Sequence, residues 1–196
     1  MRPRLAPELQ MTIEEFLVFT ESRPQEERWE LIEGAAVKNP SPTKWHQVIA
    51  ANISAALVAI AVKHGYTWIP ALGVGTRVPV SDKSLPQPDV MVFEHSLEDS
   101  ALPVTEDALV LFEVLSPSNT KADQAWRRQV YASVPNCQHY VTVSQKSVHV
   151  TRYDRATGWK AAEIRKLGDV LDLPNLGKTA AIPLAEIYRW TPLASE

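Results

Sequence analysis

The chain has 196 residues, of which 45% are apolar and 22% charged, and its formal net charge is −3. This composition is typical of a globular protein with a buried core, and the acidic balance argues against a strongly basic, non-specific nucleic-acid binder. Arginines and lysines still gather in residues 121–128 and 160–166, so a local basic patch stays open. The single cysteine excludes a disulfide framework and a zinc cluster within one chain.

The N-terminal residues are not expected to form a signal peptide. Residues 1–10 contain two prolines and no apolar core, so they predict a loose arm rather than a signal peptide. No apolar run approaches the ~20 residues that span a bilayer. We therefore expect no membrane segment and a cytoplasmic location. Thr12 followed three residues later by Glu15 is a capping-box pattern, which predicts a short helix that stops before Pro24.

A hairpin and a long helix come next. Residues 28–38 predict two strands with a tight turn at Gly34, and their period of two puts Glu30 on the face opposite Leu31. Apolar residues spaced by three and four predict a helix over about 45–64, which Gly65 ends as a C-cap. His46 continues the inward stripe of this helix in its first turn.

The rest of the chain alternates strands with two further helices. Strands are predicted at 66–70, 75–80, 89–94, 108–115, 139–143, 147–153 and 159–164. Helices are predicted at about 123–133, with residues 120–122 as an alternative first turn, and at 184–188. This order predicts a mixed central β-sheet flanked by helices, an α/β or α+β fold, with an N-terminal helix and hairpin. With no linker or repeat, we expect a single domain over 1–196.

One carboxylate stands inside the most apolar run of the chain. Residues 108–115 read as a central strand buried on both faces, yet they contain Glu113. An isolated ionised carboxylate in such a place costs several kcal/mol, so it must be protonated, paired or bound to a metal. Its alternate neighbours in the strand, Leu111 and Leu115, offer no partner.

Asp89 is the natural companion of Glu113, because it stands at the start of a strand, where a carboxylate can project into a cleft. Two carboxylates that meet form hard oxygen ligands for Mg²⁺, which also removes their mutual repulsion. Two interpretations stay open from the residues alone. Either the acids form a metal pair, or Asp89 caps a turn and Glu113 forms a buried ion pair with Arg127, Arg128 or Lys121.

An ordered set of short motifs runs along the chain: Trp29 to Gly34, His46, Pro88-Asp89, Glu113 to Ser118, and Asp123 with Tyr131. This order resembles the Uma-type family of restriction endonucleases over roughly residues 11–143. The resemblance implies the PD-(D/E)xK nuclease core, a restriction-endonuclease-like fold. It also implies that Asp89 and Glu113 hold a Mg²⁺ or Mn²⁺ ion as the catalytic metal.

The chain departs from this pattern at its basic residue. Leu115 occupies the place of the usual lysine two residues after the acid, and Arg127 stands where the family typically carries that lysine on the following helix. Arginine stabilises phosphate charge well, but it is a poor proton acceptor because its pKa stays above ~12. Arg127 would clamp phosphate or orient water, and Lys121 would assist from the loop.

Two further residues resemble positions near the family's site. Glu30 corresponds to an early glutamate, and a solvated strand residue is the structural alternative. His46 would orient a carboxylate or bind phosphate, and a buried structural histidine is its alternative. Tyr131 and Trp126 are expected to be packing residues rather than stacking platforms for bases.

Three functions are compatible with these residues. The first is a metal-dependent endonuclease that hydrolyses phosphodiester bonds in DNA. The second is a catalytically impaired relative that binds nucleic acid or a protein partner, which Arg127 and the acidic balance favour. The third is a hydrolase of small phosphorylated molecules. A homodimer is compatible with the first, because restriction-type enzymes often pair to cut two strands. The apolar C-terminal residues Ile187, Tyr188, Trp190 and Leu193 would form an interface or pack on the core.

Overall fold

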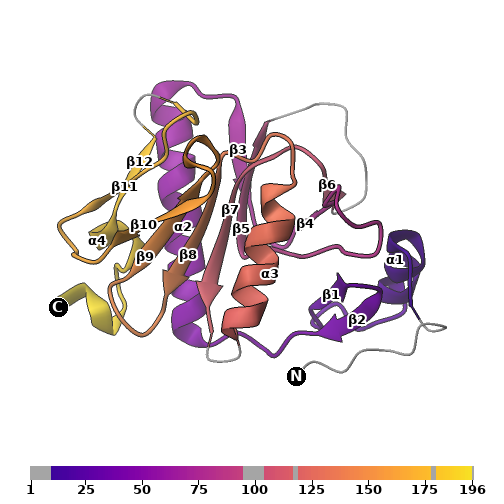
Figure 1. Cartoon of the computed structure of the whole chain (residues 1–196). Helices are drawn as coiled ribbons and strands as arrows, with labels where there is room; N and C mark the ends of the chain where they lie inside the picture. Colours follow the sequence, from indigo (N-terminus) through magenta and orange to yellow (C-terminus); the bar gives the residue numbers. More distant parts are fainter. Residues whose placement is uncertain (1–9, 95–103, 117–118, 178–179, 196) are drawn as a thin grey trace.

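A six-stranded mixed sheet forms the centre of the computed structural model, which describes residues 10–94, 104–116, 119–177 and 180–195 (Figure 1). The strand order is β10-β9-β8-β7-β5-β3. The strands are β3 (Trp68–Ala71), β5 (Val90–Glu94), β7 (Ala108–Leu115), β8 (His139–Ser144), β9 (Val150–Asp154) and β10 (Lys160–Ile164). Only β7 and β8 run parallel, and the other neighbours are antiparallel. The predicted mixed sheet flanked by helices is confirmed.

Strand β7 is central and has the bounds that its apolar run predicts. It pairs with β5 on one side and β8 on the other, and most of its residues are buried. Phe112 and Val114 face one hydrophobic cluster, while Leu111 belongs to another on the opposite face. Glu113 follows the alternation of Leu111 and therefore leaves the sheet on the side of that second cluster.

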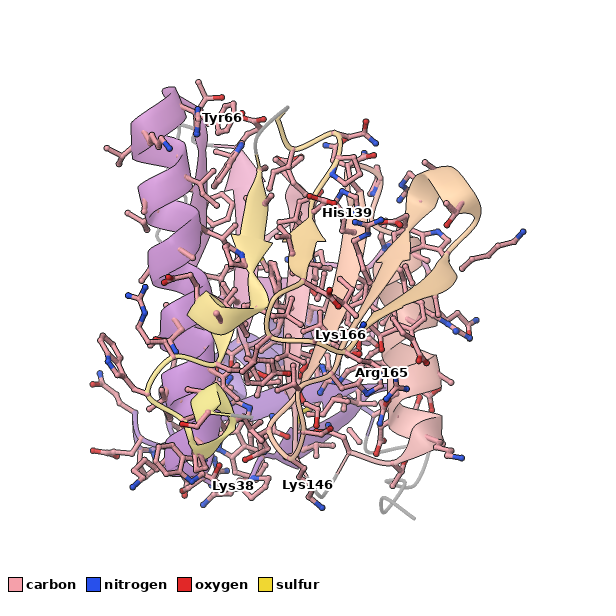
Figure 2. The ribbon with its side chains drawn as sticks, turned by 90° about the vertical axis from the view of Figure 1, so that its left-hand side faces the viewer. Lys38, Tyr66, His139, Lys146, Arg165 and Lys166 are labelled. Carbon is pink, nitrogen blue, oxygen red and sulfur yellow. The ribbon has the colours of Figure 1, made fainter. Side chains whose placement is uncertain are left out.

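Two helices cover the two faces of the sheet, as Figure 2 shows. Helix α2 (Lys44–His64) packs on the Phe112 side and ends at Gly65, whose φ of 67° is left-handed as the predicted C-cap requires. Helix α3 (Lys121–Ala132) covers the other face and begins at Lys121, within the alternative first turn predicted over residues 120–122. The hydroxyl of Thr120 accepts from the amide of Asp123, and the Asp123 carboxylate accepts from the amide of Thr120, a capping box that stabilises the extra turn.

Helix α2 corrects the expectation of no membrane-length segment. Within the described residues it is the one helix long and apolar enough, by length and composition, to cross a membrane. Its buried side chains, however, pack against the sheet and the C-terminal helix, among them Ile49, Ile53 and Leu57. This packing is that of a core helix in an α/β fold.

The N-terminal elements form a small unit beside the sheet, next to α3 in Figure 1. They are α1 (Ile13–Glu21), β1 (Trp29–Ile32) and β2 (Ala35–Lys38). The predicted capping box of Thr12 and Glu15 is present, and the hairpin turns at Glu33 and Gly34 with φ of 48° and 81°. The predicted arm lies outside the described residues except for Gln10.

Short elements complete the chain, and several differ from prediction. The strand expected over 75–80 is only β4 (Gly75–Thr76), because the amide of Ser81 donates to the carbonyl of Val78 and forms a turn there. β4 pairs with β6 (Val104–Thr105), while β11 (Val170–Asp172) and β12 (Ala181–Pro183) form a ribbon that was not predicted. The chain also contains η2 (Arg155–Thr157), α4 (Leu184–Ile187) and η3 (Pro192–Ser195).

The apolar C-terminal residues mostly pack on the core. Ile187, Tyr188 and Leu193 are buried against α2 and the sheet. Trp190 alone of the four residues considered as an interface is exposed, at 74%. The homodimer therefore stays a prediction. Of these four residues, Trp190 is the one whose side chain is accessible to a dimer interface.

Candidate active site

Two carboxylates from neighbouring strands meet at one end of the sheet. β5 and β7 pair antiparallel with Val90 opposite Phe112, and the amide of Asp89 donates to the carbonyl of Phe112 at 3.0 Å. One residue further on, this register puts Asp89 opposite Glu113, with both side chains on the same face. Asp89 Oδ2 also accepts a 2.8 Å hydrogen bond from the amide of Val114. The structure thus brings together the two acids that the sequence analysis paired.

Helix α3 holds Glu113 by one of its two oxygens. Arg127 Nη1 donates to Glu113 Oε1 at 2.9 Å, and the hydroxyl of Tyr131 donates to the same oxygen at 2.8 Å. Arg127 and Tyr131 are four residues apart and therefore share one face of the helix. The ion pair that the sequence analysis left open is present. Glu113 Oε2 accepts no hydrogen bond from the residues that the structure describes.

Glu30 is the second carboxylate on Arg127. Arg127 Nη1 and Nη2 donate to Glu30 Oε1 and Oε2 at 2.9 and 2.8 Å, a bidentate pair. The amide of Gln87 and the side chain of Asn39 donate to the same carboxylate at 2.8 and 2.9 Å. Glu30 is 0% exposed, so the solvated alternative is wrong. Both faces of β1 are covered here, since neighbouring Leu31 packs in the cluster under α1.

The two carboxyl groups that bind Arg127 have pKa values shifted in opposite directions. Burial raises the pKa of Glu113 to about 8, and the negative charges of Asp89 and Glu30 add to this rise against the effect of Arg127. Burial also works against the charge of Glu30, but Arg127 and the Gln87 amide outweigh it and the pKa of Glu30 is lowered. Burial opposes the charge of Arg127 as well, yet its two carboxylate partners raise its pKa. The site therefore holds three buried carboxyl groups, those of Asp89, Glu30 and Glu113, around the buried guanidinium of Arg127.

Asp89 has two further neighbours from other elements. His46 Nε2 lies 3.1 Å from Asp89 Oδ2, and His46 is buried in the first turn of α2 as predicted. His46 Nδ1 is buried and has no hydrogen-bond partner within the described part of the chain. Arg28 Nη1 lies 3.6 Å from Asp89 Oδ1, beyond hydrogen-bond range, and the Arg28 side chain is 31% exposed.

The basic residues take different places from those expected. Both Nη groups of Arg127 are engaged with carboxylates, so Arg127 orients Glu113, and its Nε is buried without a hydrogen-bond partner among the described residues. Lys121 is exposed at the start of α3 and makes no hydrogen bond or ion pair with any described residue. Two residues were missed. Tyr131 packs as expected but also binds Glu113, and its spacing of four from Arg127 was the available signal, while nothing in the sequence marked Arg28.

Comparison with known proteins identifies the family. A family model for Uma2, described as "putative restriction endonuclease", matches residues 13–185. This chain belongs to the Uma2 family. No curated protein matches this Uma2 chain. Among solved structures, a protein from Anabaena variabilis described as a "putative nuclease" superimposes with a TM-score of 0.73. The match covers 92% of this chain and 98% of that one at 15% identity, which shows a shared fold.

The donor set of this Uma2 protein fits a hard divalent ion. Asp89 Oδ1 and Glu113 Oε2 accept no hydrogen bond from described residues, while the other oxygen of each carboxylate is held in place. No cluster of three or more His, Cys, Asp or Glu side chains suited to a metal occurs in the described ranges. Mg²⁺ commonly binds through one or two carboxylates and keeps waters or phosphate oxygens as its other ligands. Asp89 and Glu113 suffice for that mode.

Proposed function

We propose that this protein is a divalent-metal-dependent endonuclease that hydrolyses phosphodiester bonds in DNA, with Asp89 and Glu113 as ligands of Mg²⁺ or Mn²⁺. The observation that carries the proposal is the pair of carboxylates on one face of β5 and β7, each with one oxygen fixed and one without a hydrogen bond. Membership of the Uma2 family supports the reaction class. The excess of buried acid supports a cation at this place.

The protein groups prepare the site in three ways. The Val114 amide and His46 hold Asp89, and Arg127 and Tyr131 hold Glu113, so that neither carboxylate must be ordered when substrate arrives. A bound divalent ion would polarise the phosphate and lower the pKa of a water molecule. Arg28, which is partly exposed and lies 3.6 Å from Asp89, would meet the phosphate charge.

Three lysines, called here the basic rim, support DNA as the substrate despite the net charge of −3. They are Lys44, Lys121 and Lys146, all exposed. β7 and β8 are parallel with Leu115 opposite Ser144, so the loop with Lys146 leaves the sheet at the end where Glu113 lies. Lys44 opens α2 two residues before His46. Figure 2 shows Lys146 at that end of the molecule, away from His139.

The basic rim gives a prediction on salt dependence. Lys121→Ala and Lys146→Ala are each expected to reduce the slope of log K against log salt for duplex DNA by about 1, because each lysine neutralises one phosphate. Lys63→Ala is the matched control. Lys63 is exposed in the last turn of the same helix as His46, and 17 residues of helix put it about 25 Å away. Fluorescence anisotropy with Ca²⁺ in place of Mg²⁺ measures the three slopes. Equal effects at Lys63 and Lys146 would contradict the rim.

Cleavage of supercoiled plasmid tests the function itself. The purified protein is expected to convert plasmid to open-circular and linear forms with Mg²⁺ or Mn²⁺ and to leave it intact with EDTA. The Asp89→Asn variant, prepared in the same way, is the control for contaminating nucleases. Absence of metal-dependent cleavage by the wild type, or full activity in Asp89→Asn, would refute the proposal.

The catalytically impaired alternative has one specific observation in its favour. The basic residue expected to be free at the site, Arg127, is bound to two acids, and no lysine stands two residues after Glu113. This alternative would be supported if the protein bound DNA in a salt-dependent manner but did not cleave it with any divalent metal ion. Turnover of a small phosphate ester without DNA affinity would instead support the third function.

A further inference from the structure

A groove of about 660 Å³ lies between α1 and the start of β1. One wall comes from α1 and the segment that leads into β1, and the other consists of Gly73, Gly75, Leu85, Gln87 and Val104. We call it the α1–β1 groove. Its volume lies within the ~300–1,000 Å³ that small-molecule sites typically have. No residue of the metal pair lines it, so it is separate from the carboxylates themselves.

The groove is continuous with the site through Arg28. Arg28 lines the groove and also lies 3.6 Å from Asp89 through its Nη1. Gln87, on the opposite wall, donates its amide to Glu30. The guanidinium of Arg28 makes no hydrogen bond with any residue in the described ranges, and its 3.6 Å ion pair with Asp89 is its contact with the site. A ligand in the groove would therefore end beside the metal pair.

The lining suits a base attached to a phosphate. Leu17 and Trp29 are partly exposed and supply apolar and aromatic surface, and the buried ring of Phe16 lies behind them. Trp29 is fixed, because its indole donates to Glu27 at 2.9 Å and Phe19 packs edge-on at 5.1 Å. Aromatic side chains of this kind receive nucleobases regardless of sequence.

The charges of the lining favour an anionic ligand near the site. Glu27 is hydrogen-bonded by Lys38 and by the Trp29 indole, and these bonds lower the pKa of Glu27. Arg23 and Arg28 are the cations in the groove lining. The other acid of the lining, Glu21, is the last residue of α1. A phosphate is the anion that suits a guanidinium fork beside a metal site.

We infer that the α1–β1 groove binds the nucleotide that adjoins the scissile phosphate, with Arg28 contacting the phosphate and the wall with Leu17 and Trp29 receiving the base. The inference rests on the proposed nuclease function and adds a substrate subsite to it. It also gives this chain a phosphate-binding cation that neither position 115 nor Arg127 provides.

The test fills the groove without touching the acids. Thr20 lines the groove from α1, and its hydroxyl donates only to the helix carbonyl of Leu17, so Thr20→Trp blocks the space. Val18→Trp is the matched control, since Val18 is on the same helix, is 66% exposed and does not line the groove. Affinity for a labelled duplex in Ca²⁺ is expected to fall about tenfold in Thr20→Trp. It should stay within about twofold in Val18→Trp, since no stacking surface is lost there.

Two further measurements keep the inference falsifiable if Thr20→Trp fails to fold. Arg28→Gln is expected to weaken duplex binding by a similar factor. Duplexes that carry 5-iodouracil at successive positions should crosslink the wild type to the peptide with residues 16–29. Crosslinks only elsewhere, unchanged affinity in a folded Thr20→Trp, or absence of duplex binding would each overturn the subsite. Plasmid cleavage by the wild type in Mg²⁺ reports on the nuclease function separately. If the wild type cleaves plasmid but blocking the groove leaves duplex affinity unchanged, only the subsite is refuted and the nuclease function stands.

Discussion

Replacement of Arg127 by glutamine is expected to lower the free energy of unfolding by about 3–5 kcal/mol. Arg127 is 5% exposed and donates to both oxygens of Glu30 and to Glu113. Without it, two buried carboxylates lose their cation, and the folded state alone bears the cost of an unpaired buried charge. Urea unfolding at neutral pH in EDTA measures the change.

The neighbouring arginine supplies the control. Arg128 is exposed and lies over the ring of Tyr153 at 5.3 Å, so Arg128→Gln should cost only about 0.5–1 kcal/mol. Arg127→Lys should fall between the two, because lysine keeps the charge but loses the fork that reaches both oxygens of Glu30. Equal stabilities of Arg127→Gln and Arg128→Gln would show that the network does not hold the fold together.

The elements predicted best are those whose signal is local and long. The apolar run of β7 gave the correct bounds, and the stripe and glycine cap of α2 gave its end. The ribbon of β11 and β12 was not predicted, because each strand has three residues. β12 packs on α2 and α4, and β11 pairs with β12, so neighbouring elements rather than a pattern of their own order the two strands.

The site was predictable from the sequence only where a charged residue stands within an apolar segment. A glutamate in a buried strand demands a partner, so Glu113 led to Asp89 from the sequence alone. Glu30 and Arg127 lie 97 positions apart, and no local pattern reports that they meet. The alternation in β1 suggested a solvated side for Glu30, because a period of two does not reveal a strand covered on both faces.

The two acids on Arg127 are chemically unequal, and this difference separates a structural role from a site role. Glu30 has a donor on each oxygen, four hydrogen bonds in all, and a lowered pKa. Glu113 has donors on one oxygen only, faces Asp89, and has a pKa raised to about 8. The folded state is therefore more stable with Glu30 ionised, whereas ionisation of Glu113 makes it less stable. A residue kept against its own desolvation cost is typical of a functional site.

Glu113→Gln is therefore expected to remove Mg²⁺-dependent cleavage, by on the order of 10³-fold or more, while making the metal-free protein more stable at alkaline pH. The folded-state pKa of Glu113, about 8, lies above its ordinary value of 4.5. The stabilising protonated form is thus fully present below pH 4.5 and is lost as the pH rises towards 8. Glutamine mimics that form at every pH. The stability difference between Glu113→Gln and the wild type should therefore grow across this window, towards an upper limit of about 5 kcal/mol.

Glu30→Gln is the matched control for this gain, because it touches the same arginine. It should lower stability across the same pH window, since its charge is the one that Arg127 and the Gln87 amide stabilise. Thermal unfolding with added Mg²⁺ provides the second measurement: the wild type should gain stability as the ion binds the folded state, and Glu113→Gln should not. A Glu113→Gln protein that loses several kcal/mol in EDTA at alkaline pH would make Glu113 a structural ion-pair partner. The metal-site assignment would then fail, and only the fold and the Arg127 network would remain.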